Sequence, residues 1–289
     1  MVRFEYTEPK TLNEAISLLA QNGNKAKVLA GGTDLLVVLK HRTIRPQVVV
    51  NIKNIPELCG IKVGKDAVTI GALTTHREIE LSPDIRKHLP MLADAVHTIG
   101  SVQIRNLGTV GGNICNASPA ADSVPSLVAL GTKVVIVGPS GERSMLLEEF
   151  MRGPGKTALA EGEILKGLEI PKMASRAAGA YMKHGIRKAM EIAIVGVASV
   201  VTLDGSDGVC KDARIVLGAV APTAIRAKGA EAILKGQKLT DEVILQAAEK
   251  AMTECTPISD VRSSAWYRTE MVKVFTKRAT KAALAALQG

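Results

Sequence analysis

Residues 109–123 read Thr-Val-Gly-Gly-Asn-Ile-Cys-Asn-Ala-Ser-Pro-Ala-Ala-Asp-Ser, and the rest of the chain is organised around this stretch. It holds a glycine pair and several hydrogen-bonding side chains but few bulky apolar residues. Because Gly111 and Gly112 lack a Cβ atom, their backbone can approach a ligand closely. Oriented backbone N–H groups form concavities that bind anions, so a phosphate is the expected guest. The alternative is a polar surface loop between two secondary-structure elements.

A second glycine turn lies earlier in the chain. Residues 27–30 predict a strand that leads directly into Gly31-Gly32-Thr33-Asp34, and a helix is expected after them through Lys40. A strand, a glycine turn and a helix in this order favour an anion at the helix N-terminus. A tight structural turn is the alternative. Two such turns in one domain can hold a pyrophosphate from both sides, which points to a dinucleotide or to coenzyme A.

Two common nucleotide-binding motifs are absent from the sequence. Neither the G-x-G-x-x-G spacing of nicotinamide-binding proteins nor the Walker-type loop with its lysine occurs. These absences favour an adenine dinucleotide held by a different fold.

Composition and charge narrow the class of protein. The chain has 289 residues, of which 46% are apolar and 22% charged, as in a soluble globular protein of two domains. Its formal charge is +9, but the basic residues are interleaved with acids and aromatic residues make up only 2%, which argues against a nucleic-acid partner. No signal peptide or transmembrane segment is recognised, so a cytoplasmic location is expected.

Cysteine and histidine spacing predicts no metal centre. Four widely separated cysteines show no metal or iron–sulfur pattern. His76, His88 and His97 have no second histidine or carboxylate at a ligand spacing, so surface or capping roles are expected for them. For Thr74, a cap on the helix that follows it is the alternative to a role in ligand binding. No residue stands out as a catalytic acid or nucleophile.

Local patterns predict an α+β fold in two domains, residues 1–174 and 175–289. In the first domain helices are expected between Thr11 and Gly23, over 35–40, over 83–99 and over 124–130. Strands are expected at 27–30, 48–52 and 163–170, with hairpins at 60–71 and 133–145. In the second domain three antiparallel strands, at 179–183, 192–203 and 210–220, precede helices at 225–234, 241–252 and 263–287.

Several motifs in a fixed order resemble the FAD-binding (medium) subunits of the molybdenum hydroxylases. They are Ala30-Gly31-Gly32-Thr33-Asp34-Leu35, Ile70-Gly71-Ala72-Leu73-Thr74, Gln103-Ile104-Arg105-Asn106, residues 109–123, Tyr181-Met182-Lys183, Pro222-Thr223-Ala224-Ile225-Arg226-Ala227 and Asp260-Val261-Arg262. This family includes the carbon monoxide dehydrogenase medium subunit and the flavin domain of xanthine dehydrogenase, and the resemblance covers nearly the whole chain. It implies a two-part α/β FAD-binding domain of the vanillyl-alcohol oxidase and xanthine dehydrogenase flavin fold.

The resemblance also implies a cofactor site. Its residues are Ala30, Gly31, Gly32, Thr33, Asp34, Leu35, Thr74, Thr109, Gly111, Gly112, Asn113, Ser118, Asp122, Ile164, Leu165 and Lys183. Residues 30–35 are expected to wrap the FAD pyrophosphate, Asp122 to accept hydrogen bonds from ribose hydroxyls, and Lys183 to lie near the flavin ring. Core packing for Ile164 and Leu165, and a solvated surface position for Lys183, are the alternatives.

The implied function is electron transfer, with orientation and electrostatics supplied by the protein. In the family, electrons from a substrate oxidised at a molybdenum cofactor pass through iron–sulfur clusters to FAD and then to an external acceptor such as NAD or a quinone. The partners are therefore expected to be an iron–sulfur (small) subunit and a molybdopterin (large) subunit, in a dimer of heterotrimers. A stand-alone FAD reductase or oxidase and a non-enzymatic nucleotide-binding module are the alternatives.

Overall fold

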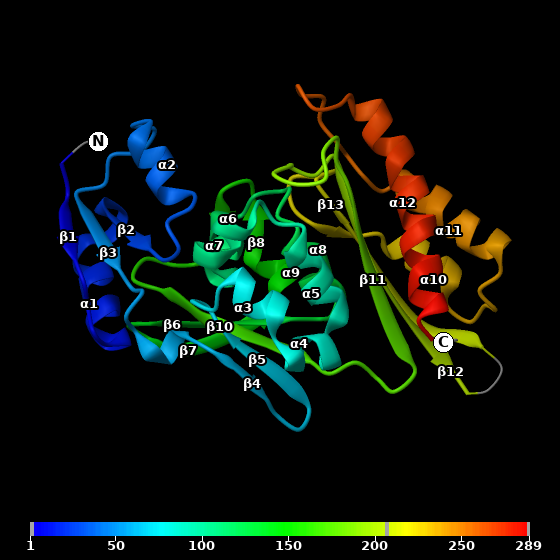
Figure 1. The fold of residues 1–289 in the computed structure, drawn as a ribbon, viewed down its shortest axis with the longest axis horizontal. Helices are drawn as coiled ribbons and strands as arrows, with labels where there is room; N and C mark the ends of the chain where they lie inside the picture. The colour runs from blue at the N-terminus through cyan, green and yellow to red at the C-terminus, as the bar shows by residue number, and fades with distance from the viewer. Residues whose placement is uncertain (1–2, 206–207, 288–289) are drawn as a thin grey trace.

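The computed structural model describes residues 3–205 and 208–287, which form three parts in a row (Figure 1). A small parallel sheet near the N-terminus is followed by a central antiparallel sheet covered by short helices. A second antiparallel sheet with three helices ends the chain. This order gives the α+β fold that the sequence predicts.

The N-terminal part is a three-stranded parallel sheet of order β1-β3-β2. Its elements are β1 (Glu5–Thr7), α1 (Leu12–Asn22), β2 (Ala26–Leu29), α2 (Leu35–Lys40) and β3 (Val48–Asn51). The Thr11 hydroxyl accepts a hydrogen bond from the Glu14 N–H at 3.2 Å and so caps α1, as its sequence predicts. The central strand is β3, and all four of its residues, Val48–Asn51, are buried. This is typical of a parallel strand that is covered on both faces.

The central part is a five-stranded antiparallel sheet of order β4-β5-β10-β6-β7. Its strands are β4 (Ile61–Val63), β5 (Ala67–Gly71), β6 (Lys133–Gly138), β7 (Gly141–Leu146) and β10 (Ile164–Pro171). A small separate pair is formed by β8 (Met151–Gly153) and β9 (Lys156–Thr157). The helices are α3 (His76–Leu81), α4 (Pro83–His88), α5 (Pro90–His97), α6 (Val102–Leu107), α7 (Val110–Asn116), α8 (Ser123–Ala129) and α9 (Leu147–Phe150). Both predicted hairpins are present, as β4–β5 and β6–β7.

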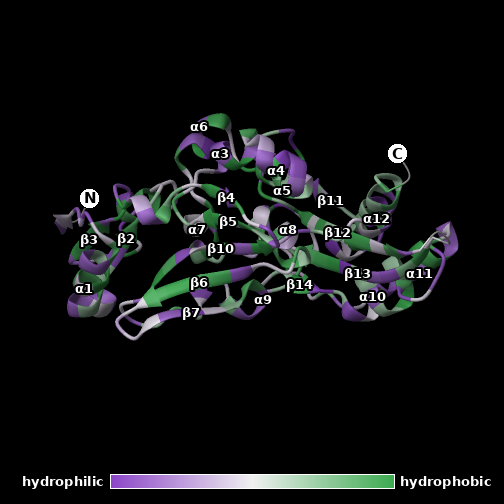
Figure 2. Cartoon of the chain, turned by 90° about the horizontal axis from the view of Figure 1, so that it is seen from below, coloured by the Kyte–Doolittle hydropathy of each residue, from purple (hydrophilic) through white to green (hydrophobic). Residues whose placement is uncertain are grey.

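The C-terminal sheet has the order β11-β12-β13-β14 and is antiparallel. Its strands are β11 (Ala177–His184), β12 (Val195–Asp204), β13 (Val209–Gly218) and β14 (Ile225–Arg226), and the helices are α10 (Lys228–Leu234), α11 (Asp241–Met252) and α12 (Ala265–Ala285). One face packs against α10 and α12, and the other against α5 and α8 of the central part. Both faces of β12 are therefore buried, which explains its almost continuous hydrophobic sequence, seen in green in Figure 2.

Some predicted elements differ from the observed ones, each for a local reason. The helix expected over 83–99 is broken into α4 and α5 because Pro90, which has no N–H, begins a new helix. Thr75, not Thr74, caps α3. The two-residue β14 adds a fourth strand to the predicted three and occupies the start of the helix expected at 225.

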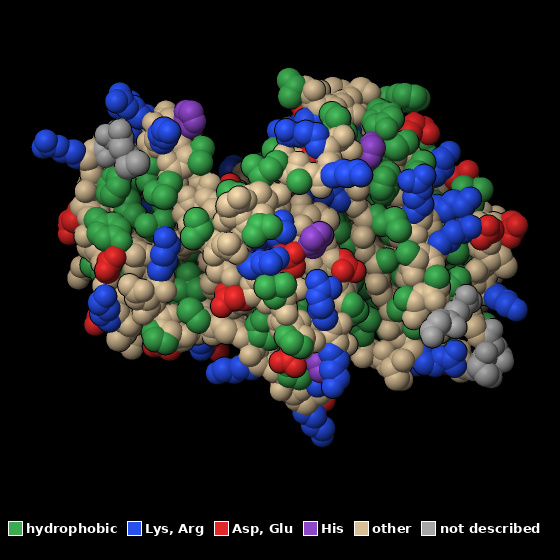
Figure 3. Space-filling view, in the orientation of Figure 1, with side chains coloured by type: hydrophobic (Ala, Val, Ile, Leu, Met, Phe, Trp, Pro, Cys, Tyr) green, Lys and Arg blue, Asp and Glu red, His purple; other side chains and the backbone are tan. Residues whose placement is uncertain are grey.

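The domain boundary expected at 174/175 falls in the segment that joins β10 to β11. In the described part of the chain no helix is both long and apolar enough to span a membrane. Lys and Arg side chains are spread over the face drawn in Figure 3 and do not gather in one patch. That distribution matches the interleaved charges of the sequence.

Candidate functional site: a cleft between two glycine segments

A cleft of about 710 Å³ lies between the N-terminal part and the helices of the central part. Its volume is in the range of small-molecule and cofactor sites. Residues 30–35 line one side and α7 lines the other, and the space-filling view is hollowed between these two parts (Figure 3). The two glycine segments, which are far apart in the sequence, therefore face the same space.

The loop of residues 30–35 presents free backbone donors. Among the described residues, no hydrogen-bond acceptor is found for the backbone N–H groups of Gly32, Thr33, Asp34 and Leu35. Gly32 adopts φ +81°, a left-handed conformation that favours glycine. Partly exposed N–H groups in such a turn before a helix are the usual receptor for a phosphate.

Gly31 sets how closely this loop packs against the central part. A Cβ atom at this position would overlap the backbone carbonyl oxygen of Leu107. On the facing helix, a Cβ atom on Gly112 would lie 3.9 Å from the Cβ of Ala30. Because Gly31 and Gly112 have no side chain, the loop of residues 30–35 can pack closely against α6 and α7 at one end of the cleft.

The stretch that begins at Thr109 differs from the amide concavity expected for it. It is a helix, α7, and its first N–H groups already have partners inside the protein. The Val110 N–H donates to the Thr74 carbonyl at 3.0 Å, that of Gly111 to the Ala72 carbonyl at 2.9 Å, and that of Gly112 to the Thr109 hydroxyl at 3.1 Å. Gly111 is needed for contact with Ala72, whose Cβ would lie 2.6 Å from an added Cβ. This wall therefore supplies shape and side chains, and the opposite loop supplies free amides.

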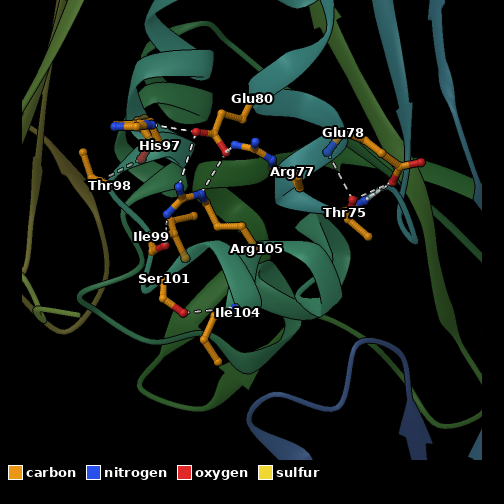
Figure 4. A network of polar contacts seen from close by, with 11 residues as sticks. Thr75, Arg77, Glu78, Glu80, His97, Thr98, Ile99, Ser101, Ile104 and Arg105 are labelled. Carbon is orange, nitrogen blue, oxygen red and sulfur yellow. Dashed lines mark hydrogen bonds and ion pairs between the residues drawn. The ribbon is translucent and has the colours of Figure 1, made fainter. Parts of the chain in front are cut away.

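Helices α3 and α6 close the end of the cleft, and a buried ion pair joins them (Figure 4). Glu80 on α3 accepts hydrogen bonds from Arg105 Nε at 2.9 Å, Arg77 Nη1 at 3.0 Å and His97 Nδ1 at 2.6 Å. Arg105 on α6 also donates to the carbonyl of Ile99, a cleft residue, at 2.9 Å. A capping box of Thr75 and Glu78 fixes the start of α3.

The charge of Glu80 is maintained by this network. Burial alone would raise its pKa, but the hydrogen bonds from Arg105, His97 and Arg77 outweigh burial and lower the pKa to about 2. Both members of the Glu80–Arg105 pair are almost fully buried. The pair therefore holds two cleft-lining helices in a fixed relation at neutral pH.

His76, the first residue of α3, is a cleft residue that the sequence did not identify. Surface or capping roles were expected, but its side chain is only 2% exposed and lines the cleft. Burial and the nearby charge of Arg105 lower its pKa to about 4, so the ring is neutral at pH 7. Its position at the beginning of a helix directly after Thr74 and Thr75 was visible in the sequence, but its burial depends on packing with α6.

Asp122 and Lys183 form an ion pair and are not among the residues that line the cleft. Lys183 Nζ donates to Asp122 Oδ2 at 2.7 Å and to the carbonyls of Glu191 and Thr98, at 2.7 and 3.0 Å. The Tyr181 hydroxyl donates to the other Asp122 oxygen at 3.0 Å. Burial raises the pKa of Asp122, with Lys183 and Tyr181 opposing the shift, and burial together with Asp122 raises that of Tyr181 well above its usual value.

The other candidate residues divide into two groups. Residues 30–35, Thr109, Gly111, Gly112, Asn113 and Ile164 line the cleft. Thr74, Ser118 and Leu165 lie outside its lining: the Thr74 hydroxyl bonds to the backbone of Gly60, and Leu165 is in the central core. Asn113 accepts a hydrogen bond from the Ser123 hydroxyl at 2.8 Å, which fixes its side-chain carbonyl.

Further cleft residues could not be recognised from their sequence pattern. They include Ile99, Ile104 and Cys115, and the loop Leu159–Glu163 that precedes β10. Apolar residues such as Ile99 look like ordinary core positions in a sequence. Burial raises the pKa of the Cys115 thiol to about 12, so it is protonated at neutral pH. Within the described residues, no cluster of three or more His, Cys, Asp or Glu side chains is arranged to hold a metal ion.

The donor set of the cleft fits a dinucleotide that has a pyrophosphate. Four consecutive, partly exposed N–H groups without acceptors in the chain are available to a ligand with several oxygens, and the glycines leave room for it. The apolar side chains of Ile164, Ile99 and Ile104 along the cleft suit the face of a ring system.

Comparison with known proteins gives the family. Residues 2–173 match the family described as the FAD binding domain in molybdopterin dehydrogenase, and residues 180–283 match the CO dehydrogenase flavoprotein C-terminal domain. The carbon monoxide dehydrogenase medium chain of Hydrogenophaga pseudoflava is 38% identical over 98% of both chains. The putative xanthine dehydrogenase FAD-binding subunit of Escherichia coli K12 is 36% identical over 98% of this chain and 97% of its own.

Solved structures show the same fold. A carbon monoxide dehydrogenase from Hydrogenophaga pseudoflava that lacks the Mo-pyranopterin moiety superposes with a TM-score of 0.95, at 39% identity over 98% of each chain. Quinoline 2-oxidoreductase from Pseudomonas putida 86 gives a TM-score of 0.93 at 31% identity over 99% of each chain. With the resemblance of the sequence motifs thereby confirmed, the chain belongs to the FAD-binding subunits of the molybdenum-containing oxidoreductases, and its cofactor is FAD.

Proposed function

We propose that the chain is the electron-transfer subunit of a heteromeric molybdenum-dependent dehydrogenase, and that its cleft is the FAD site. The observation that carries the proposal is the run of unpaired N–H groups over Gly32–Leu35, opposite the wall made by α7. These amides bind the pyrophosphate, and Thr109, Gly111, Gly112 and Asn113 shape the second wall. FAD supplies the redox chemistry because it exchanges electrons singly or in pairs.

The chain's own part is to bind, orient and shield the cofactor. Gly31 and Gly111 set the width of the cleft through close backbone contacts. The Glu80–Arg105 pair holds α3 and α6 at its end. Ile164 offers an apolar surface to the cofactor from the start of β10.

The roles assigned to Asp122 and Lys183 stay predictions. Both side chains already make hydrogen bonds within the chain, and these bonds must be shared or broken for either residue to contact the cofactor. A ribose hydroxyl would share the Asp122 carboxylate with Lys183 and Tyr181, since both carboxylate oxygens already accept a hydrogen bond. Lys183 already donates three hydrogen bonds, so a bond to the flavin requires one of them to break. Ser118, Thr74 and Leu165 also lie outside the cleft lining, and their contacts with the cofactor stay predictions as well.

The proposed partners are an iron–sulfur subunit and a molybdopterin subunit, assembled as a dimer of heterotrimers. Relatives of similar identity are named medium chains or FAD subunits of dehydrogenases for carbon monoxide, glyceraldehyde and nicotinate, each over nearly its whole length. Since such different substrates accompany one flavin subunit, the substrate is selected on another subunit. Electrons then leave through this chain to an external acceptor, NAD or a quinone. A cytoplasmic location and a domain boundary at 174/175 belong to the same proposal.

The test is FAD binding by the purified full-length chain. We expect about one FAD per chain, measured by the visible flavin spectrum after gel filtration, and co-purification of both partner subunits from the native source. A chain that stays colourless after incubation with FAD contradicts the proposed cleft function. Turnover of a small substrate by the isolated chain would favour a stand-alone reductase or oxidase, and tight binding of ADP or coenzyme A in place of FAD would favour a nucleotide-binding module.

A further inference from the structure

The side chain of His76 is buried at the cleft, and neither of its ring nitrogens makes a hydrogen bond within the described chain. Its Nδ1 atom is closed off from solvent and has no partner among the described residues. Its Nε2 atom also makes no hydrogen bond within the described chain, but it is not among the buried atoms without a partner. The ring lines the cleft, so Nε2 is the nitrogen that can meet a ligand. A buried polar ring of this kind normally finds a partner.

The position of the ring proton follows from the cost of burying each form of nitrogen. An unpaired buried N–H group is rarer in proteins than an unpaired buried acceptor. The proton of the neutral ring is therefore assigned to Nε2, where it can meet a ligand, and the unpaired Nδ1 keeps its lone pair. His76 thus presents one neutral N–H donor to the cleft.

Thr33 shows which part of the ligand this donor meets. The ring carbon Cδ2 of His76 and the hydroxyl oxygen of Thr33 lie 3.4 and 3.5 Å from the point that a Cβ atom of Gly108 would occupy. Thr33 belongs to the loop with the free N–H groups, whose natural guest is a pyrophosphate. The missing side chain of Gly108 leaves room between Thr33 and His76.

We propose that His76 is a further cofactor-binding residue, which donates a hydrogen bond from Nε2 to a pyrophosphate oxygen of FAD. The inference rests on the proposed FAD site in this cleft. It explains why a polar ring without a partner in the described chain is buried at the first position of α3, while the nearby Arg105 donates to Glu80 and to the Ile99 carbonyl. The ring stays neutral through burial and the charge of Arg105, so its contribution is that of a directed donor and not that of a cation.

The test compares three variants of the full-length chain by calorimetric titration with FAD and with ADP. His76→Leu removes the donor and keeps an apolar side chain of similar size. His76→Gln keeps an N–H donor near the position of Nε2. His88→Leu, on the α4 helix outside the cleft lining, is the matched control. Circular dichroism and the melting temperature of each variant establish that it is folded.

We expect His76→Leu to bind both FAD and ADP about 10-fold more weakly, because a hydrogen bond to a charged oxygen is lost. His76→Gln and His88→Leu should bind like the wild type. Unchanged binding of both ligands by folded His76→Leu overturns the proposal. A loss of affinity for FAD alone also overturns it, because it would place the contact of His76 on the flavin part of the cofactor, which ADP lacks. Failure of the wild-type chain to bind FAD at all contradicts the proposed function instead, so the two outcomes remain distinct.

Discussion

Missing side chains shape the cleft as much as the side chains that line it. Gly31 and Gly111 are required by close approach to Leu107 and Ala72, and Gly32 by its positive φ. The sequence shows glycine pairs at both positions, but it does not show which glycine makes a contact and which one turns the chain. The structure assigns close packing to Gly31 and the turn to Gly32.

Gly31→Ala is expected to weaken FAD binding at least 10-fold and to destabilise the chain by about 1–3 kcal/mol. The added methyl group overlaps the Leu107 carbonyl, so the loop with the free N–H groups must move away from α6. Flavin titration and chemical denaturation measure the two effects.

Gly229→Ala on α10 is the matched control for this substitution. Its Cβ atom would meet the ends of the Lys250 and Glu254 side chains, and Glu254 accepts hydrogen bonds from the Gly229 and Ala230 N–H groups at 3.0 Å. The substitution therefore disturbs α10, outside the cleft lining, and we expect a loss of stability with FAD binding close to wild type for the control. Equal FAD binding by the two variants would mean that Gly31 is not a packing constraint on the cleft.

The helix α3 illustrates how one element combines two titratable groups in opposite states. His76 and Glu80 are four residues apart and so lie on one face of the helix. The first is buried neutral with a pKa lowered to about 4, and the second is buried ionised with a pKa lowered to about 2. Arg105 favours both states, because its charge repels a proton from the ring and stabilises the carboxylate.

The packing of α3 should therefore make stability depend on pH. An unfolded histidine takes up a proton near pH 6.5, whereas His76 in the folded chain does so only near pH 4. As the pH falls through this window the unfolded state binds more protons, so the free energy of unfolding decreases, by on the order of 3 kcal/mol from this group. In His76→Gln this contribution is absent. Denaturation curves at several pH values between 4 and 7 measure the difference, and parallel curves for the two proteins would contradict it.

Most elements could be predicted from the sequence because their patterns are local. The capping box at Thr11, the two hairpins and the helix Asp241–Met252 have clear local patterns and are present as expected. The break at Pro90 is not predicted, although a proline marks it, because the apolar periodicity continues through it. The cap at Thr75 needed the reciprocal bond with Glu78 to be distinguished from one at Thr74.

The site was predictable only in part, because a sequence does not show which hydrogen bonds are already made. Glycine turns and a family resemblance identified the two walls of the cleft. That the N–H groups of Gly111 and Gly112 have internal acceptors follows from how α7 packs against residues 72–74. The burial of His76 follows from contact between α3 and α6, which no local pattern reveals.

The central and C-terminal parts of the molecule are joined by apolar packing and by a buried ion pair. The central hydrophobic core includes Ala198 and Val200 of β12 in the C-terminal sheet, so the two predicted domains share a core at their junction. Asp122, just before α8, and Lys183, on β11, meet there with side chains 8% and 10% exposed. Tyr181 and the carbonyls of Thr98 and Glu191 complete the set of hydrogen bonds.

Asp122→Asn should destabilise the full chain by about 3–5 kcal/mol, because it leaves the Lys183 ammonium buried without a counter-charge. Lys183→Met alone leaves the Asp122 carboxylate unpaired and should cost a similar amount. The double substitution removes both charges and is expected to recover much of the loss, which a double-mutant cycle of denaturation free energies measures. Additive losses in the free energy of unfolding would show that the two side chains do not stabilise each other. The junction would then be stabilised by its apolar contacts alone. If Asp122 in addition binds the ribose of FAD, the double variant regains stability but not FAD affinity, so flavin titration on the same proteins separates the role at the junction from the role in binding.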